Sequence, residues 1–274
     1  MAKSNEVTTD ASTIRNILTL RYDPTQSTSL TILSSRDYNP IETVSVEYIE
    51  KSMQEYVQDK IDKSNIKKIV VALSGGIDST LVLALLRKKF PNIDVETISI
   101  KFAQSLDESE KAAKISEFFG VKHQTIQLEN YLEEIPQAIS AVGLPFWDLH
   151  WYYVVKKARA ITKHLASGDG GDELFGGYTF RYSKFLSLVT ESSTPLDKVK
   201  AYLACHERDN VSDQQDVFGP KAEFSWDKIY QFLLPYFDNK LDPLNQVFLA
   251  DYNGKLLYNF SIVNTKIHNH FEIN

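Results

Sequence analysis

Short apolar runs alternate with helical patterns between residues 69 and 166, and this alternation restricts the possible folds more than any other feature of the chain. The run at residues 69–73, Ile-Val-Val-Ala-Leu, is rich in β-branched residues, as in strands that are buried on both faces of a parallel sheet. Further strands are predicted at residues 95–102, 124–128 and 164–166, and helices at 80–90, 108–119, 130–142 and 150–163. This order predicts an α/β fold in which helices cover both faces of a doubly wound parallel sheet.

The segments on either side of this region carry other patterns. Residues 1–13 are polar and are predicted to be poorly ordered, and two β-prone runs around a Pro-containing turn predict a hairpin over residues 16–34. Helices are expected at 45–62, 180–190, 196–207, 227–237 and 243–258. We therefore expect an N-terminal flap (1–45), an α/β domain (46–190) and a helical C-terminal part (191–274).

Charge and cysteine content exclude several classes of protein. The chain has 30 basic and 36 acidic residues, a formal net charge of −6, whereas nucleic-acid-binding surfaces are usually basic. No apolar run approaches the roughly 20 residues of a membrane-spanning helix, and the polar N-terminus is unlike a secretory signal. The single cysteine, Cys205, excludes an intramolecular disulfide framework and a multi-cysteine metal site. We expect a cytoplasmic protein without nucleic-acid or membrane partners.

The first motif, residues 73–80, reads Leu-Ser-Gly-Gly-Ile-Asp-Ser-Thr and lies between a predicted strand and a predicted helix. Two consecutive glycines let the backbone turn tightly, so that the N–H groups of the turn and of the helix start form a concave anion site. The hydroxyls of Ser74, Ser79 and Thr80 add donors, and the Asp78 carboxylate is compatible with a bound phosphate if Mg²⁺ lies between them. Helix capping by Ser and Asp is the alternative interpretation, but the whole string favours phosphate binding.

The second motif, residues 167–178, reads Ser-Gly-Asp-Gly-Gly-Asp-Glu-Leu-Phe-Gly-Gly-Tyr and follows the last predicted strand. Five glycines and three acidic residues within these twelve positions are unfavourable in any regular element. A flexible acidic turn is the simplest explanation, but it accounts neither for the position after a strand nor for the apolar Leu-Phe pair. We expect the two motifs to meet at the carboxyl edge of the sheet and to bind one ligand there.

Both motifs resemble sequences of known enzyme families. The first motif, which lacks the Gly-Lys-Ser/Thr ending of a Walker A loop, resembles the pyrophosphate-binding loop (PP-loop) of the N-type ATP pyrophosphatases. The second motif resembles the signature of the synthase domain of glutamine-hydrolysing asparagine synthetases, and the similarity runs from about Leu20 to the end of the chain. Residues 107–108 (Asp-Glu) and 145–148 (Pro-Phe-Trp-Asp) match shorter patterns of that family. The resemblance implies an adenine nucleotide alpha hydrolase-like fold and an ATP-dependent ligase.

The resemblance also assigns roles to individual residues. It implies that the first motif holds pyrophosphate, that Asp78 and Asp172 hold Mg²⁺ from two sides, and that the second motif closes over the adenylate. Asp169 stands where many members carry a Glu that acts as general base on ammonia; the shorter Asp either acts through water or has another role. The implied catalytic residues are therefore Asp169, Asp78 and Asp172. The implied nucleotide-binding residues are Leu73, Ser74, Gly75, Gly76, Asp78, Ser79, Ile100, Ser167 and Gly168.

The implied reaction follows from carboxylate chemistry. A carboxylate does not react with ammonia because its leaving group is poor, whereas attack on the α-phosphate of ATP converts it to an acyl-adenylate that releases AMP readily. Charge builds on pyrophosphate as the bond breaks, so Mg²⁺ and fixed backbone donors would supply most of the acceleration. A base then accepts a proton from the attacking amine. The expected substrates are ATP, ammonia and a carboxylate, with aspartate as the default and asparagine as its product.

The chain departs from the family at both ends. Residue 2 is Ala where a glutaminase domain would place Cys, and only about 70 residues precede the first motif. We therefore expect ammonia to come from solution or from a separate glutaminase subunit. The sequence ends before the family's Val-x-Pro-Phe-Leu-Asp element and before a lysine that steadies the phosphates. This predicts a truncated fragment of a longer protein, a chain without the activity, or one completed by a partner.

Two other functions stay open beside an amide-forming ligase that releases AMP and pyrophosphate. A tRNA-modifying ATP pyrophosphatase would favour a basic surface and catalytic cysteines, whereas this chain has a charge of −6 and one cysteine. A non-catalytic or partner-dependent nucleotide-binding module is favoured by the missing lysine. The presence of both Asp78 and Asp172 argues against that module.

Overall fold

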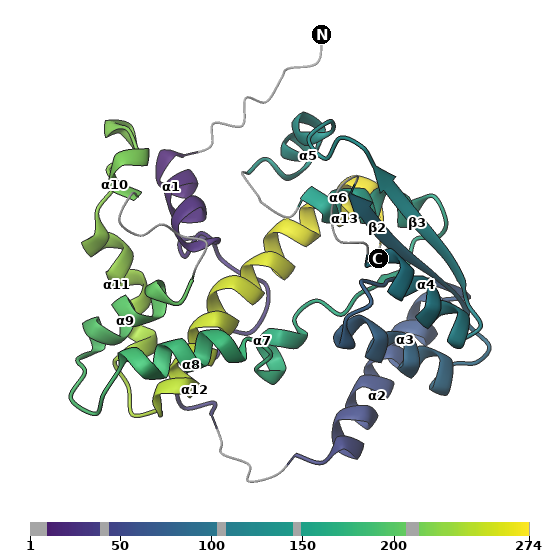
Figure 1. Cartoon of the computed structure of the whole chain (residues 1–274), viewed down its shortest axis with the longest axis horizontal. Coiled ribbons are helices and arrows are strands. Elements are labelled where there is room, and N and C mark those ends of the chain that lie inside the picture. Colours follow the sequence, from purple (N-terminus) through teal and green to yellow (C-terminus); the bar gives the residue numbers. More distant parts are fainter. Residues whose placement is uncertain (1–9, 39–43, 103–107, 145–148, 207–213, 274) are drawn as a thin grey trace. The chain divides into compact units, whose positions relative to one another are not determined.

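The computed structural model describes residues 10–38, 44–102, 108–144, 149–206 and 214–273 (Figure 1). Some of the predictions from the sequence concern residues outside the described ranges, namely residues 1–9, residue 107 and residues 145–148. The chain forms two compact units, each assembled from separate segments. The sheet unit comprises residues 40–141, 147–169 and 266–274, and the helical unit comprises residues 1–39, 142–146 and 170–265. The domain boundaries expected near residues 45 and 190 stay predictions.

The sheet unit contains a four-stranded parallel sheet with the order β3-β2-β1-β4. Its strands are β1 (Lys68–Ala72), β2 (Asp94–Phe102), β3 (Lys122–Leu128) and β4 (Leu165–Ala166). In register, Ile69 pairs with Val95 on β2, and Val70 pairs with Leu165 on β4. The chain therefore builds outward from β1 through β2 to β3 and then returns to the other side of β1 with β4. This reversal confirms the predicted doubly wound sheet.

Helices connect the strands and cover the sheet (Figure 1). They are α2 (Val46–Ser64), α3 (Ile77–Lys89), α4 (Ser109–Phe118), α5 (Ile135–Val142), α6 (Leu149–Arg159) and α13 (Thr265–Phe271), with Val142 and Thr265 just outside the unit. α13 packs on α6, where the ring of Phe271 meets the ring of Tyr152 edge-on with centroids 5.0 Å apart. The predicted helices of this region are confirmed, but α3 begins at Ile77 rather than Thr80, which places Asp78 in its first turn.

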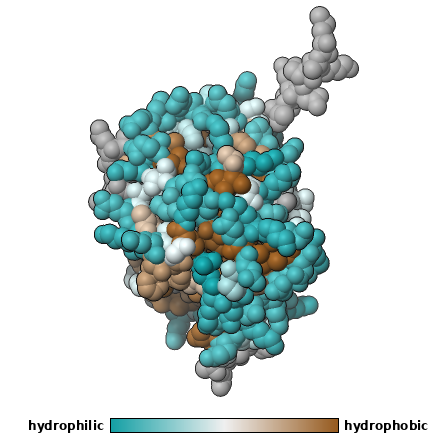
Figure 2. Space-filling model, turned by 90° about the vertical axis from the view of Figure 1, so that its right-hand side faces the viewer, coloured by the Kyte–Doolittle hydropathy of each residue, from teal (hydrophilic) through white to brown (hydrophobic). Residues whose placement is uncertain are grey.

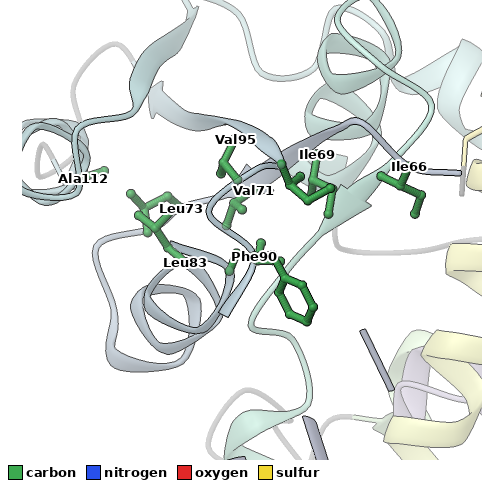
Figure 3. Packing of buried hydrophobic residues seen from close by; sticks show 10 residues of the cluster. Ile66, Ile69, Val71, Leu73, Leu83, Phe90, Val95 and Ala112 are labelled. Atoms are coloured by element: carbon green, nitrogen blue, oxygen red, sulfur yellow. The ribbon is translucent and has the colours of Figure 1, made fainter. Parts of the chain in front are cut away.

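Alternate residues of β1 point to opposite faces of the sheet and bury both. Ile69, Val71 and Leu73 pack on one face against Leu83 of α3 and Phe90 just beyond it (Figure 3). Full burial of an aliphatic side chain contributes about 1.5–3 kcal/mol, so this cluster fixes the position of α3 on β1. The opposite face packs against the buried side of α6, which confirms helices on both faces of the sheet.

The helical unit has its own core and no strand among its described residues. Its elements are α1 (Ala11–Leu20), α7 (Gly171–Phe175), α8 (Thr179–Leu188), α9 (Pro195–Ala204), α10 (Gln214–Val217), η2 (Pro220–Ala222), α11 (Trp226–Phe237), α12 (Pro243–Asp251), η3 (Tyr252–Leu256) and η4 (Asn259–Asn264). Phe185, Leu233 and Phe237 are among its fully buried side chains. The predicted helices are confirmed, except that α12 ends at Asp251 and the chain continues in the π-helical segments η3 and η4.

The hairpin predicted over residues 16–34 is wrong. Residues 11–20 form helix α1, and the described residues that follow contain turns and bends but no strand. Six of the ten residues of α1 are buried, namely Thr13, Arg15, Asn16, Ile17, Thr19 and Leu20, and four of these, Thr13, Asn16, Ile17 and Leu20, lie on one helix face. Local β-propensity is a weak signal, and burial of this face overrides it.

The surface seen from the side of β3 and α4 is mainly hydrophilic and is crossed by a strip of hydrophobic residues (Figure 2). Exposed apolar side chains of the sheet unit include Ile77, Leu81 and Phe118. None of the helices in the described ranges is both long and apolar enough to cross a membrane.

Candidate functional site

The two motifs follow neighbouring strands at the point where the strand order reverses. The first motif leaves the carboxyl end of β1, and the second leaves the carboxyl end of β4. Ile100, one of the predicted nucleotide contacts, lies near the carboxyl end of β2 and pairs with Ile126. Crevices at such reversal points are where open α/β sheets bind ligands.

The first motif forms a tight turn between β1 and α3. Leu73 continues the ladder between β1 and β2, because its N–H donates to the Ile98 carbonyl at 2.8 Å. Gly75 has a φ of +79°, a left-handed conformation that glycine adopts without steric cost. Gly76 is the N-cap of α3, and no side chain of the described residues caps that end. The start of α3 therefore has the character of a helix N-terminal anion site.

The hydroxyl groups of the first motif brace the turn. Ser79 Oγ accepts the Ser74 N–H at 3.3 Å and lies 3.2 Å from Ser74 Oγ. The Thr80 hydroxyl donates to the Gly76 carbonyl at 2.7 Å. These bonds hold the loop in one shape, and the predicted contacts of the hydroxyls with phosphate stay predictions.

The second motif meets the first at Gly168, within the sheet unit. A Cβ added to Gly168 would overlap the backbone nitrogen of Ser79 and would lie 2.6 Å from the carbonyl carbon of Asp78. Only glycine therefore fits here without a shift of the backbone. The turn formed by Ser167 and Gly168 lies directly on the first turn of α3, so the structure brings these two predicted segments together.

The three predicted acidic residues are distributed over both units. Asp78 is half-buried in the first turn of α3. Asp169 is exposed, and its N–H donates to Ser167 Oγ at 3.4 Å, so it lies on the same turn. Asp172 lies in the first turn of α7 and belongs to the helical unit. The sheet unit thus holds Asp78 beside the segment that carries Asp169, and the pairing of Asp172 with Asp78 stays a prediction.

The oxygen donors at this edge suit Mg²⁺. This ion is usually held by one or two carboxylates together with phosphate oxygens and water, and the half-buried Asp78 supplies such a carboxylate next to a predicted phosphate loop. Within the described ranges, no group of three or more His, Cys, Asp or Glu residues could hold a metal ion.

A basic side chain beside the first motif escaped the sequence analysis. The Cβ, Cγ and Cδ atoms of Lys111 on α4 each lie 3.3 Å from the position that a Cβ on Gly75 would occupy. The two residues are far apart in the chain, and β2 brings their helices together on one face of the sheet. The sequence around the first motif contains no pattern that predicts this contact.

The opposite edge of the sheet carries charges that neutralise one another. A shallow cleft there is lined in part by Asp94, Glu96 and Lys122. Lys68 pairs with Glu96 and lies 3.1 Å from Asp94, and Lys122 lies 3.5 Å from Glu96. The hydrogen bond from Lys68 is the main reason that the pKa of Glu96 is lowered. These pairs leave little uncompensated charge for a ligand, so the carboxyl edge remains the candidate site.

The far end of the second motif is anchored in the helical unit. The Tyr178 hydroxyl donates to Glu173 at 2.8 Å, and the Arg181 guanidinium lies 4.7 Å from the centre of the Tyr178 ring. Arg181 in turn pairs with buried Asp251 at 3.1 Å. Burial, with the nearby Glu173 carboxylate, raises the pKa of Tyr178. The motif therefore ends in a fixed hydrogen-bonded arrangement rather than in a loose acidic turn.

Comparison with known proteins gives a family match over most of the chain. Residues 49–259 match the asparagine synthase family. The glutamine-hydrolysing asparagine synthetase 1 of Bacillus subtilis (strain 168) is 28% identical over 160 residues, which cover 56% of this chain and 25% of that protein. The NH₃-dependent NAD⁺ synthetase of Staphylothermus marinus is 22% identical over 222 residues, which cover 71% of this chain and 78% of that protein.

Among solved structures, the NH₃-dependent NAD synthetase of Campylobacter jejuni aligns with 77% of this chain and 94% of its own, at 18% identity and a TM-score of 0.38. The chain spans about a quarter of the length of the Bacillus subtilis asparagine synthetase. The family match includes both motifs and both strands from which they start. On that match, the chain belongs to the asparagine synthase family.

Proposed function

We propose that this protein is an ATP-dependent ligase that activates a carboxylate as an acyl-adenylate and then forms an amide with ammonia. The observation that carries the proposal is the contact of Gly168 with the first turn of α3. It joins a loop suited to phosphate with a second loop that bears a carboxylate, at the reversal point of the sheet. Membership of the asparagine synthase family supports the same class of reaction.

In this reaction, a substrate carboxylate oxygen attacks the α-phosphorus of ATP, the bond to the bridging oxygen breaks, and pyrophosphate leaves. The backbone N–H groups at the α3 start stabilise the charge that grows on pyrophosphate. The backbone of Leu73 and Ile100 and the turn of Ser167 and Gly168 hold the AMP part. These groups are fixed by the sheet before the substrate binds, so little reorganisation is needed.

Asp78 is the residue of the sheet unit that would hold Mg²⁺, with Asp172 as the second ligand implied by the resemblance. When bound, the ion neutralises charge on the phosphates. Ammonia then attacks the acyl carbon, the bond to AMP breaks, and Asp169 accepts the proton directly or through water. The exposure of Asp169 agrees with a base that must meet a diffusing amine.

Aspartate is the proposed carboxylate and asparagine the proposed product, with ammonia supplied from solution or by a separate glutaminase subunit. A second candidate is the amidation that yields NAD⁺ from its carboxylate analogue. The match to an NAD⁺ synthetase over 78% of that enzyme's length favours this candidate. The two candidates share the first motif and differ only in the acyl substrate.

The test is to identify the products that the protein makes from ATP with Mg²⁺, ammonium and either aspartate or the carboxylate analogue of NAD⁺. Phosphorus NMR distinguishes AMP and pyrophosphate from ADP and phosphate. AMP that forms together with asparagine supports the first candidate, and AMP that forms together with NAD⁺ supports the second. Production of ADP without AMP would place the protein outside this class of ligase.

A further inference from the structure

We propose that Lys111 on α4 binds the pyrophosphate part of ATP and supplies the positive charge that the first motif lacks. This inference rests on the proposed function, because it assumes that the first motif holds the β- and γ-phosphates. Residues 73–80 contain no Lys or Arg, so a cation at this loop must come from another element.

The stem of Lys111 runs across the loop at Gly75. Three successive carbons of its side chain, Cβ, Cγ and Cδ, are equally close to the Gly75 Cβ position, each at 3.3 Å. The ammonium is two bonds beyond Cδ, about 2.5 Å further with ordinary bond lengths. It therefore lies within about 6 Å of that position, at the turn that leads into the α3 N-terminus.

Gly75 makes this approach possible in two ways. Its left-handed φ of +79° turns the loop toward α3, and its lack of a side chain leaves room for the lysine stem. A side chain at position 75 would press on three carbons of Lys111 at once. Glycine is therefore required at position 75 both for its φ and for the contact with Lys111. The second requirement cannot be predicted from the first motif alone.

The ammonium of Lys111 is available for a ligand. Several other lysines of the sheet unit are paired with carboxylates: Lys68 with Asp94 and Glu96, Lys88 and Lys89 with Glu50, and Lys156 with Glu134. The side chain of Lys111 forms no ion pair or hydrogen bond within the part of the chain that the structure describes. A lysine on an exposed helix turn, with its stem held at a phosphate loop, can direct its ammonium to a phosphate oxygen.

The test separates the charge of Lys111 from the packing of its stem. Lys111→Met keeps an unbranched stem over Gly75 and removes the charge, and Lys111→Arg keeps a charge there. Lys114→Met is the matched control, because Lys114 is exposed on the same helix and has no ion pair among the described residues. Calorimetry on the whole chain measures the binding of Mg·ATP, of magnesium pyrophosphate and of AMP to each variant.

We expect Lys111→Met to weaken the binding of Mg·ATP and of pyrophosphate by about 10- to 100-fold, the usual worth of one hydrogen bond to a charged group. Its affinity for AMP should change less than about twofold, because AMP lacks the β- and γ-phosphates. Lys111→Arg should retain most of the affinity, and Lys114→Met should match the wild type. The wild-type affinity for pyrophosphate should also fall more steeply with salt than that of Lys111→Met.

The other outcomes contradict either the role of Lys111 or the proposed function. Wild-type affinity of Lys111→Met for both ATP and pyrophosphate would remove Lys111 from the site and leave the proposed function intact. An equal loss of AMP affinity would show that the substitution acts through the fold. If the wild type binds neither ATP nor pyrophosphate, the proposed function and this inference both fail. Lys111→Gln serves as a second neutral variant if the thermal midpoint of Lys111→Met is lowered.

Discussion

Asp78 shows how one residue can serve both the fold and the site. A carboxylate in the first turn of a helix is stabilised by the helix dipole, which contributes about 0.3–1 kcal/mol. That contribution needs no ligand, so the position of Asp78 in α3 is compatible with a purely structural role. The structural role and the metal-binding role can be distinguished by the effect of magnesium on nucleotide affinity. Asp78 increases the affinity for phosphate only if it binds an ion that also binds the phosphate.

We therefore predict that Asp78→Asn weakens Mg·ATP binding by about tenfold or more, the value of one lost charge-assisted contact. ATP without magnesium should bind the variant as well as or better than the wild type, because the substitution removes a repulsive charge. Calorimetry with and without magnesium measures both affinities. Asp94→Asn, at the other edge of the sheet, is the control, and equal magnesium dependence in Asp78→Asn and wild type would remove Asp78 as a ligand.

His206 in the helical unit is held between two fixed hydrogen-bond partners. Its Nδ1 lies 2.8 Å from the Tyr202 carbonyl and its Nε2 lies 2.7 Å from the Arg181 guanidinium. A carbonyl only accepts and a guanidinium only donates, so the ring is neutral with its proton on Nδ1. Burial, together with Lys255 and Arg181, lowers the pKa of His206 well below its ordinary value.

A pKa that is lowered on folding makes protonation favour the unfolded chain. The contribution of His206 is complete above the unfolded pKa of about 6.5 and declines below it, by at most about 1.4 kcal/mol per pH unit. We predict a free energy of unfolding that falls between pH 7 and pH 5 and a flatter profile in His206→Gln, measured by urea denaturation. An unchanged slope in His206→Gln would contradict the assignment.

At the scale of elements, the contact between the second motif and α3 decides whether the site can form. We predict that Gly168→Ala abolishes detectable Mg·ATP binding, because its Cβ would overlap the backbone of Ser79 and displace the turn. Overpacking of this kind also costs about 1–3 kcal/mol of stability. Calorimetry and thermal unfolding measure the two effects.

Gly219→Ala is the control for that substitution, since a Cβ at Gly219 meets nothing within 4 Å and its φ is −70°. It should leave nucleotide affinity and stability as in the wild type. Normal binding by Gly168→Ala would show that the turn of Ser167 and Gly168 is not part of the nucleotide site.

The parallel sheet was predictable from the sequence because each strand is a short apolar run followed by a helical pattern. The motifs were predictable for a related reason: both follow strands and contain glycines that a regular element would not hold. The hairpin failed because Thr13, Asn16, Ile17 and Leu20 include two polar residues whose burial depends on tertiary contacts. The contact between Lys111 and Gly75 was likewise invisible, because it depends on how two helices pack on one sheet.

At the scale of the whole molecule, each unit has its own hydrophobic core. Leu83 is fully buried in the sheet unit and Leu233 is fully buried in the helical unit. Truncation of a buried leucine to alanine typically costs about 2–5 kcal/mol. The two substitutions should therefore weaken different sets of backbone hydrogen bonds.

We predict that Leu83→Ala lowers hydrogen-exchange protection mainly in β1, β2 and α3, and that Leu233→Ala lowers it mainly in α9 and α11. Hydrogen exchange read by mass spectrometry maps the affected segments. The exposed Leu81→Ala and Leu196→Ala are the controls in the two units. A uniform loss of protection across all segments in both core variants would mean that the molecule unfolds only as one cooperative whole.

The return of α13 to α6 has a consequence for how the protein is made. Arg159 on α6 donates to the Phe271 carbonyl at 2.8 Å, so residues near position 271 complete a surface begun before residue 160. Residues 170–265 of the helical unit lie between these segments and must leave the ribosome first. At about 5–20 residues per second, the roughly 100 residues between these segments take about 5–20 s to synthesise. During that time Trp151 and Tyr152 of α6 lack the rings of His268 and Phe271 that pack against them in the folded protein.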